Sequence, residues 1–280
     1  MPYAVAQDGV KLHYELHDYT DPWKKAPVLI LQHGLARSAR FWYNMVPYLA
    51  RFYKVICPDL RGCGASSSDF DLKAGLTISN YISDFMSIAD ALEVDDLHFA
   101  GESIGGTLGF VFAAEHPGRV RTLTTFGSPL VVADWLQKSL ALTYPTWIEA
   151  LQKMGSEAWS KAIAPAPAFP HNIDPGLFEW YTDEMGKSKV EVLIAMAELV
   201  PGVDAEPFLG RIQCPVLGVY PNESPAAPDQ LETMKREIPN FQLLRMGTRF
   251  QVAQALAPAT CASHLLHFVS THDGTACREL

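Results

Sequence analysis

The sequence has no run of eighteen consecutive apolar residues, and its first residues hold neither a basic cluster nor an apolar stretch. A membrane-spanning helix needs such a run, and a secretory signal peptide needs such a start. We therefore expect no membrane span and no signal peptide. No basic cluster is longer than Lys24-Lys25, and the net charge is −9. This charge distribution argues against a nucleic-acid partner.

Cysteine is scarce, and its spacing is irregular. The five cysteines are an odd number, and no two of them form a CxxC pair. Such usage favours free thiols in a reducing compartment and argues against a structural zinc site. The sequence also lacks a G-x-G-x-x-G or Walker A loop and a metal-ligand cluster of His, Asp or Glu. We expect a cytoplasmic protein with no cofactor and no metal.

Apolar runs and helical patterns alternate along most of the chain. The turn signal Asp8-Gly9 precedes an alternating segment and predicts a β-hairpin. Helical spacing of apolar residues predicts helices over 77–93 and 106–115. Continuous apolar runs predict buried strands at 27–34, 53–60, 96–103, 120–129, 214–221 and 240–247. Together these segments predict an α/β protein with a mostly parallel eight-stranded sheet and helices on both faces.

The alternation stops between about Val131 and Pro207, where the patterns are helical and no strand run occurs. Four of the six tryptophans lie in this stretch. We therefore expect a core formed by residues 1–130 and 208–280, with residues 131–207 inserted as a helical cap. The last residues, 271–280, are expected to fray.

The segment Gly101-Glu102-Ser103-Ile104-Gly105 lies between an apolar strand and a buried helix. This is the G-x-S-x-G pattern of a nucleophile elbow, in the strand-turn-helix context that the pattern requires. The serine must take a strained backbone conformation there, and the two glycines remove Cβ atoms that would clash across the turn. The following helix directs its N-terminal N–H groups toward a developing oxyanion. The pattern predicts Ser103 as a nucleophile.

A second glycine loop, Gln32-His33-Gly34-Leu35, ends the first long strand. The backbone N–H groups of Leu35 and Ile104 are predicted to form an oxyanion hole. Two interpretations of His33 stay open. It could act as a base, or it could pack and hydrogen-bond behind the loop.

Three segments and the helical insertion together resemble the α/β-hydrolase family, of the capped esterase and C–C-hydrolase type. The segments are HGLARSARFW (33–42), PDLRGCGASS (58–67) and GESIGG (101–106). The resemblance spans essentially the whole chain and implies the α/β-hydrolase fold. It also implies a serine nucleophile, an acid after a later core strand, and a histidine after the last strand.

The implied partners of the serine are missing from their places. Ser224 occupies the place of the acid, and Glu223 beside it would reach the site only after a loop rearrangement. Gln251 occupies the place of the histidine, and residues 241–256 contain no histidine. An amide cannot accept the proton of a serine near neutral pH. Losing the base of a serine triad lowers kcat by about 10⁴–10⁶.

Three explanations remain open. The chain could be an inactivated variant of a working hydrolase. Another group could serve as the base, with His171, His33 and Glu223 as candidates. Alternatively, the fold could be kept for its pocket, in a cofactor-free lyase, isomerase or cyclase, or in a ligand-binding protein.

The expected pocket lies above the carboxyl ends of the parallel strands, with the cap as its roof. Ser103, Gln251 and Leu35 converge there, beside His33 and Gly34. The aromatic candidates for its lining are Trp42, Trp135, Trp147 and Trp180, although each could instead hold the cap together. Such a lining favours a small apolar or aromatic substrate. The leading expectation is a hydrolase of a small ester, lactone or activated C–C bond.

Overall fold

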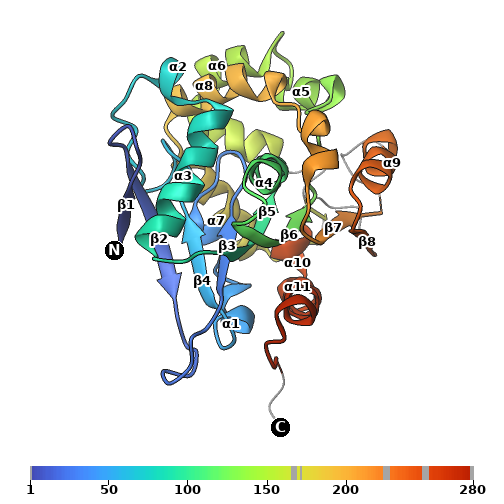
Figure 1. The fold of residues 1–280 in the computed structure, drawn as a ribbon. Helices are drawn as coiled ribbons and strands as arrows, with labels where there is room; N and C mark the ends of the chain where they lie inside the picture. Colours follow the sequence, from blue (N-terminus) through green and yellow to red (C-terminus); the bar gives the residue numbers. More distant parts are fainter. Residues whose placement is uncertain (1, 165–168, 171, 223–227, 248–251, 278–280) are drawn as a thin grey trace.

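The computed structural model describes residues 2–164, 169–170, 172–222, 228–247 and 252–277. Its strands form one eight-stranded sheet in the order β1-β2-β4-β3-β5-β6-β7-β8 (Figure 1). β2 pairs antiparallel with β1 and β4, and all other neighbours are parallel. The predicted mostly parallel sheet is therefore confirmed. The strands are β1 (Tyr3–Val5), β2 (Lys11–His17), β3 (Val28–Gln32), β4 (Lys54–Pro58), β5 (Leu97–Glu102), β6 (Val120–Phe126), β7 (Val216–Pro221) and β8 (Phe241–Met246).

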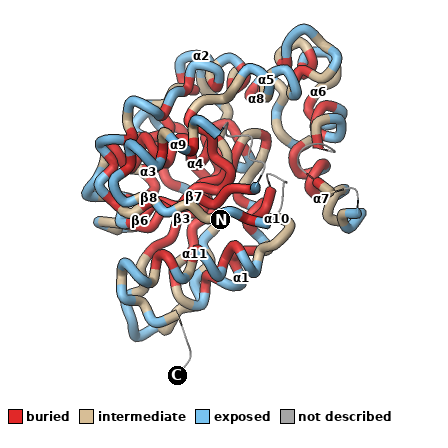
Figure 2. Tube along the Cα trace, turned by 90° about the vertical axis from the view of Figure 1, so that its right-hand side faces the viewer, coloured by how far each residue is buried: buried red, intermediate tan, exposed pale blue. Residues whose placement is uncertain are grey.

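Helices cover both faces of the sheet, each with its own hydrophobic cluster. Apolar residues of α3 (Ile78–Ala91), α4 (Ile104–Glu115) and α9 (Pro228–Glu237) belong to the larger cluster. Those of α1 (Val46–Leu49) and α11 (Pro258–Asp273) belong to the other. α4 is apolar on all sides and is buried along nearly its whole length (Figure 2), because the sheet and α3 enclose it. The short helices of the core are η1 (Ala39–Trp42), α2 (Leu72–Gly75) and α10 (Ala253–Leu256).

The chain between β6 and β7 is helical. An isolated antiparallel bridge, Val131 to Asp204, and a bond from Ala205 N–H to Leu130 O (3.1 Å) join the two ends of this segment. α5, α6 and α8 lie together on one side of the sheet in Figure 1. The helices are α5 (Asp134–Ala141), α6 (Trp147–Ile163), α7 (Pro175–Gly186), α8 (Val190–Leu199), η2 (Val200–Gly202) and η3 (Glu206–Arg211). No helix in the described ranges has both the length and the apolar character that crossing a bilayer requires.

The direction in which strands are added reverses between β3 and β5. From β3 the chain continues to β4 on one side, whereas β5 pairs with the other side of β3. Ligands of open α/β sheets bind at such a reversal, outside the carboxyl ends of the strands. Gln32 at the end of β3 pairs with Gly101 on β5, so the loops that follow these two strands are neighbours.

The expectation that the chain frays from residue 271 is wrong for the first of these residues. α11 continues to Asp273, whose carboxylate accepts a bond from Tyr53 Oη (3.0 Å) and lies 3.0 Å from His98 Nε2. The side chains of His98 and Asp273 are each 1% exposed. The C-terminal end of α11 is thus held against the start of β5.

Candidate active site

Ser103 stands alone between the end of β5 and the start of α4. Its backbone has φ 53° and ψ −126°, which is strained for a residue that carries a Cβ. Its N–H donates to Phe126 O (3.0 Å), and its carbonyl accepts from the N–H groups of Gly106 (3.0 Å) and Thr107 (3.1 Å). These bonds hold the strained residue in place. The side chain is half-buried, so the hydroxyl group is not sealed inside the core.

Two glycines allow the backbones around Ser103 to pack closely. A Cβ at Gly101 would lie 2.5 Å from the carbonyl carbon of Gly105. A Cβ at Gly105 would lie 2.5 Å from His33 O and 2.7 Å from Gln32 O. Backbone atoms cannot rotate away as a side chain can. Glycine at both positions is therefore what brings the start of α4 against the end of β3.

The predicted oxyanion donors lie on these two backbones. Ile104 is the first residue of α4, and Leu35 follows the end of β3 at a turn where Ala36 has φ 55°. Among the described residues, neither N–H group donates to another protein group. Both N–H groups remain predicted ligands of an oxyanion.

His33 is fully engaged behind the loop. Its Nε2 accepts a bond from Leu60 N–H (3.0 Å), and its Nδ1 lies 2.8 Å from Gly34 O. The proton must therefore be on Nδ1, where it is donated to that carbonyl. Burial lowers the pKa of His33, which favours this neutral ring. With both nitrogens used, the geometry supports the packing interpretation of His33 rather than the base.

Glu102 and Arg37 form a buried ion pair next to the elbow, and the sequence did not reveal it. Arg37 Nη1 lies 2.5 Å from Glu102 Oε2, and the Glu102 side chain is 1% exposed. Arg37 Nε donates to the hydroxyl of Tyr181 on α7 (2.7 Å). Burial raises the pKa of Glu102, although Arg37 opposes that shift. The one feature of the sequence that could have indicated this ion pair is the acidic residue at the end of the apolar strand LHFAGE.

Asp59, in the segment PDLRGCG, ties the loop after β4 to its neighbours. Its carboxylate accepts from the N–H groups of Ala39 (2.7 Å) and Ala65 (2.8 Å), and lies 2.7 Å from His13 Nδ1. Burial alone would raise the pKa of Asp59. The bond with His13, the nearby His33 and the two backbone bonds together hold it below its ordinary value. Asp59 is thus a structural anion beside the site.

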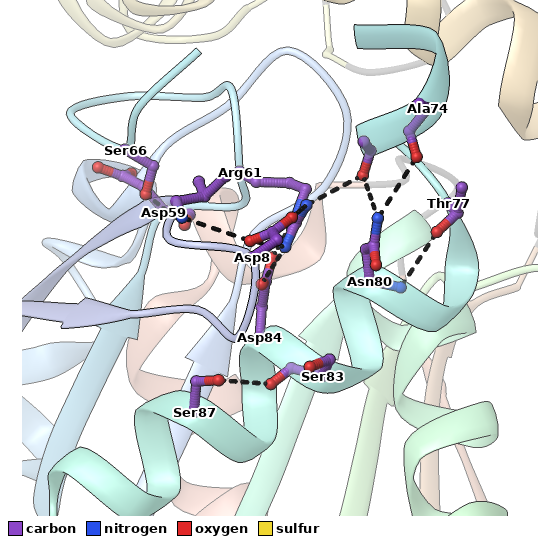
Figure 3. Close-up of polar contacts among 12 residues, drawn as sticks. Asp8, Asp59, Arg61, Ser66, Ala74, Thr77, Asn80, Ser83, Asp84 and Ser87 are labelled. Atoms are coloured by element: carbon purple, nitrogen blue, oxygen red, sulfur yellow. Dashed lines mark hydrogen bonds and ion pairs between the residues drawn. The ribbon is translucent and has the colours of Figure 1, made fainter. Parts of the chain in front are cut away.

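Arg61 joins the same loop to the hairpin and to α3 (Figure 3). Its guanidinium bonds to both carboxylate oxygens of Asp84 (2.7 and 2.5 Å) and to Asp8 (2.8 Å). A further N–H donates to Gly75 O (3.1 Å). The Arg61 side chain is 1% exposed, so it supports the loop from within rather than facing a ligand.

Comparison with known proteins agrees with this architecture. Residues 27–155 match the family model described as alpha/beta hydrolase fold. The enol-lactonase from Burkholderia xenovorans LB400 superposes with a TM-score of 0.83, covering 96% of this chain and 100% of that one at 20% identity. The chain has the α/β-hydrolase fold.

Two further α/β-hydrolase comparisons cover nearly the full length. A thermophilic esterase from Thermogutta terrifontis has a TM-score of 0.82, with 97% of this chain and 98% of that one covered at 18% identity. A proposed carbamate hydrolase, RutD of Azorhizobium caulinodans, is 27% identical over 98% of this chain and 100% of its own length. The relatives named here are thus described as enzymes that act on different substrates.

The four tryptophans predicted to line the pocket lie in different surroundings. Trp42 is buried in the cluster beneath α1 and α11, with its ring 5.9 Å from that of Phe126. Trp147 is buried in the larger cluster, and Trp135 is 46% exposed. The ring of Trp180 lies 4.7 Å from that of Tyr43. Their contribution to a pocket stays a prediction.

Three predicted site residues, Gln251, Glu223 and His171, lie outside the described residues, so their roles also stay predictions. His264 and His267 lie on the exposed side of α11. Within the described ranges, no three His, Cys, Asp or Glu side chains form a group that could hold a metal ion.

Proposed function

We propose that this chain is a serine-nucleophile hydrolase of small molecules with an ester, lactone, carbamate or activated C–C bond. The observation that carries the proposal is Ser103 itself: a strained, half-buried serine between the end of β5 and the start of α4. The N–H groups of Leu35 and Ile104, on the backbones that meet there, donate to no other group among the described residues. The names of the relatives support the ester, lactone and carbamate part of this range.

In this mechanism the Ser103 hydroxyl attacks the carbonyl carbon, and the oxyanion accepts bonds from Leu35 and Ile104. Collapse of the intermediate expels the leaving group, and water then releases the acyl group from Ser103. The proton of Ser103 needs an acceptor, and Gln251 in the place of the histidine cannot supply one. Glu223 is the remaining acidic candidate. Residues 131–207 would form the cap over residues 1–130 and 208–280, above a small apolar or aromatic substrate.

A second candidate is a non-hydrolytic member of the fold. It is favoured by the absence of histidine from residues 241–256 and by the engagement of both His33 nitrogens. Such a protein would use the two N–H groups to hold a carbonyl or enolate oxygen, as a lyase, isomerase, cyclase or ligand-binding protein. An inactivated hydrolase would behave in the same way until its base is restored.

One experiment separates these candidates. Wild type, Gln251→His and Ser103→Ala are incubated with p-nitrophenyl acetate and with a fluorophosphonate, and the labelled peptide is identified by mass spectrometry. We expect slow labelling of Ser103 in wild type and a rate higher by about 10²–10⁴ in Gln251→His, because a positioned base contributes that factor. Labelling at another residue, or none in either protein, would remove the hydrolase proposal in favour of the second candidate.

A further inference from the structure

We propose that Arg37 is a positioning residue of the Ser103 site: it fixes Glu102 behind the elbow and ties both to α7 through Tyr181. This inference rests on the proposed role of Ser103 as nucleophile. It adds a residue that neither the G-x-S-x-G pattern nor the oxyanion hole contains.

The Arg37–Glu102 pair touches both halves of the predicted oxyanion hole. Glu102 directly precedes Ser103 and Ile104 in the chain. A Cβ at Gly34 would lie 2.5 Å from Glu102 Oε2 and 2.8 Å from Arg37 Nη1, so the pair packs directly against the backbone that leads to Leu35. A shift of this pair would therefore move the two N–H donors relative to each other.

Arg37 also connects the elbow around Ser103 to α7 in the helical segment between β6 and β7. Its Nε donates to Tyr181 Oη (2.7 Å), and its guanidinium carbon lies 5.4 Å from the centre of the Tyr181 ring. The planar guanidinium offers donors in fixed directions, so one side chain can bind a carboxylate and a hydroxyl at once. The position of α7 is in this way coupled to the residue before Ser103.

Among the described residues, few other titratable groups act on this pair. They are Tyr181 of α7 and His33 of the loop. Burial raises the pKa of Tyr181 and lowers the pKa of His33, so both stay neutral near pH 7. Burial would lower the pKa of Arg37, but Glu102 and Tyr181 outweigh that effect and keep it protonated. Arg37 is therefore the main group that compensates the Glu102 carboxylate.

Arg40 offers a matched control. It lies in the same segment and also reaches α7, with its Nη1 3.2 Å from Glu184 Oε1. However, its side chain is 56% exposed, and in the described part of the chain it makes no contact with Glu102. Its partner Glu184 is buried but also pairs with Lys187, so removing the exposed Arg40 side chain does not leave that carboxylate without a cation, and we expect little effect. Arg40→Met thus removes a link to the cap without touching the elbow.

The first test measures the second-order rate constant of Ser103 labelling by a fluorophosphonate, in wild type or in the Gln251→His background. We expect Arg37→Met to lower it by roughly 10–100-fold, since a small misplacement of reacting groups has that effect. Tyr181→Phe should lower it less, and Arg40→Met should leave it within about twofold. Equal effects of Arg37→Met and Arg40→Met would overturn the proposal.

The second test is a double-mutant cycle in thermal unfolding, which does not depend on labelling. Arg37→Met leaves the Glu102 carboxylate buried without its partner and should lower Tm by on the order of 10 °C at pH 8. Because Glu102 then has a pKa raised further above its unfolded value, the deficit should shrink as the pH falls to 5. Adding Glu102→Gln should restore most of the loss.

These two tests fail in different ways. If Ser103 is labelled in no background, the proposed function falls, and the cycle alone decides whether Arg37 holds Glu102. Additive effects of Arg37→Met and Glu102→Gln at both pH values would refute the coupling even where labelling succeeds.

Discussion

At the scale of single residues, buried charges organise the loops around Ser103. Asp59 is 3% exposed and receives three bonds, two of them from backbone N–H groups. An isolated buried carboxylate would be unfavourable, but one with its lone pairs satisfied holds a loop in one conformation. Asp59 therefore contributes to the stability of the fold through its charge.

The free energy of unfolding should depend on pH through the charge of Asp59. The pKa of Asp59 is lower in the folded protein than the ordinary 3.8, so its contribution is present above pH 3.8 and is lost as the pH falls through the folded value. We expect Asp59→Asn to lower the free energy of unfolding by about 1–3 kcal/mol at pH 7 and to flatten its fall at acid pH. Urea unfolding from pH 2.5 to 7 measures both.

The control for this prediction is Asp96→Asn, because Asp96 pairs with Arg121 at the surface with 42% of its side chain exposed. Its stability curve should run parallel to that of wild type. A parallel curve for Asp59→Asn as well would show that Asp59 carries no such charge effect.

Sequence reasoning predicted the strand-serine-helix turn but not the charged residues beside it. Ser103 was predictable because its whole pattern lies within five neighbouring residues between a strand and a helix. The partners of Arg37 lie 65 and 144 positions away in Glu102 and Tyr181. No periodicity or local spacing brings such residues together, so only the fold reveals the pair.

At the scale of elements, the junction between β5 and α4 was predicted in kind but not in its bounds. The apolar pattern predicts a strand over 96–103 and a helix over 106–115, whereas β5 ends at Glu102 and α4 begins at Ile104. The helix starts earlier because the turn is completed within Ser103 alone. Gly105 and Gly106 belong to the first turn of the helix and lie in close contact with the ends of β3 and β5.

Gly105→Ala should break this junction. The added methyl group would lie 2.5 Å from His33 O, and backbone must move to admit it. We expect a loss of about 3 kcal/mol in the free energy of unfolding and the loss of Ser103 labelling. Gly118→Ala is the matched control, since a Cβ there meets nothing within 4 Å. Equal stability of the two variants would contradict the role assigned to Gly105.

At the scale of the whole molecule, local patterns predicted the sheet, but they did not predict that the C-terminal end of α11 is held against the core. Strand runs and the resemblance together gave the fold class and the number of strands. The C-terminal residues looked like a polar tail, yet Asp273 reaches Tyr53 and His98, which lie 220 and 175 positions away. This contact depends on α11 packing against α1 and the sheet, which sequence spacing does not encode.

Removing the carboxylate that makes this contact should destabilise the entire domain. Asp273→Ala leaves the buried His98 Nε2 and the Tyr53 hydroxyl without their partner, which we expect to lower the free energy of unfolding by about 2–4 kcal/mol. Chemical denaturation followed by tryptophan fluorescence measures it. Asp183→Ala, at an exposed carboxylate paired with Lys161, should change stability by less than about 0.5 kcal/mol. If the C-terminal residues were frayed, Asp273→Ala and Asp183→Ala would have equally small effects on the free energy of unfolding.

The bridge between Val131 and Asp204 has a consequence for how this molecule can vary. The helical segment leaves the core and returns to it at almost the same point. Because the two ends of the segment are neighbours, a segment of another length could replace it without any change in the path of the strands. The strands would then keep their register. The helical segment between β6 and β7 is therefore the part of this fold whose length can change while the sheet stays the same.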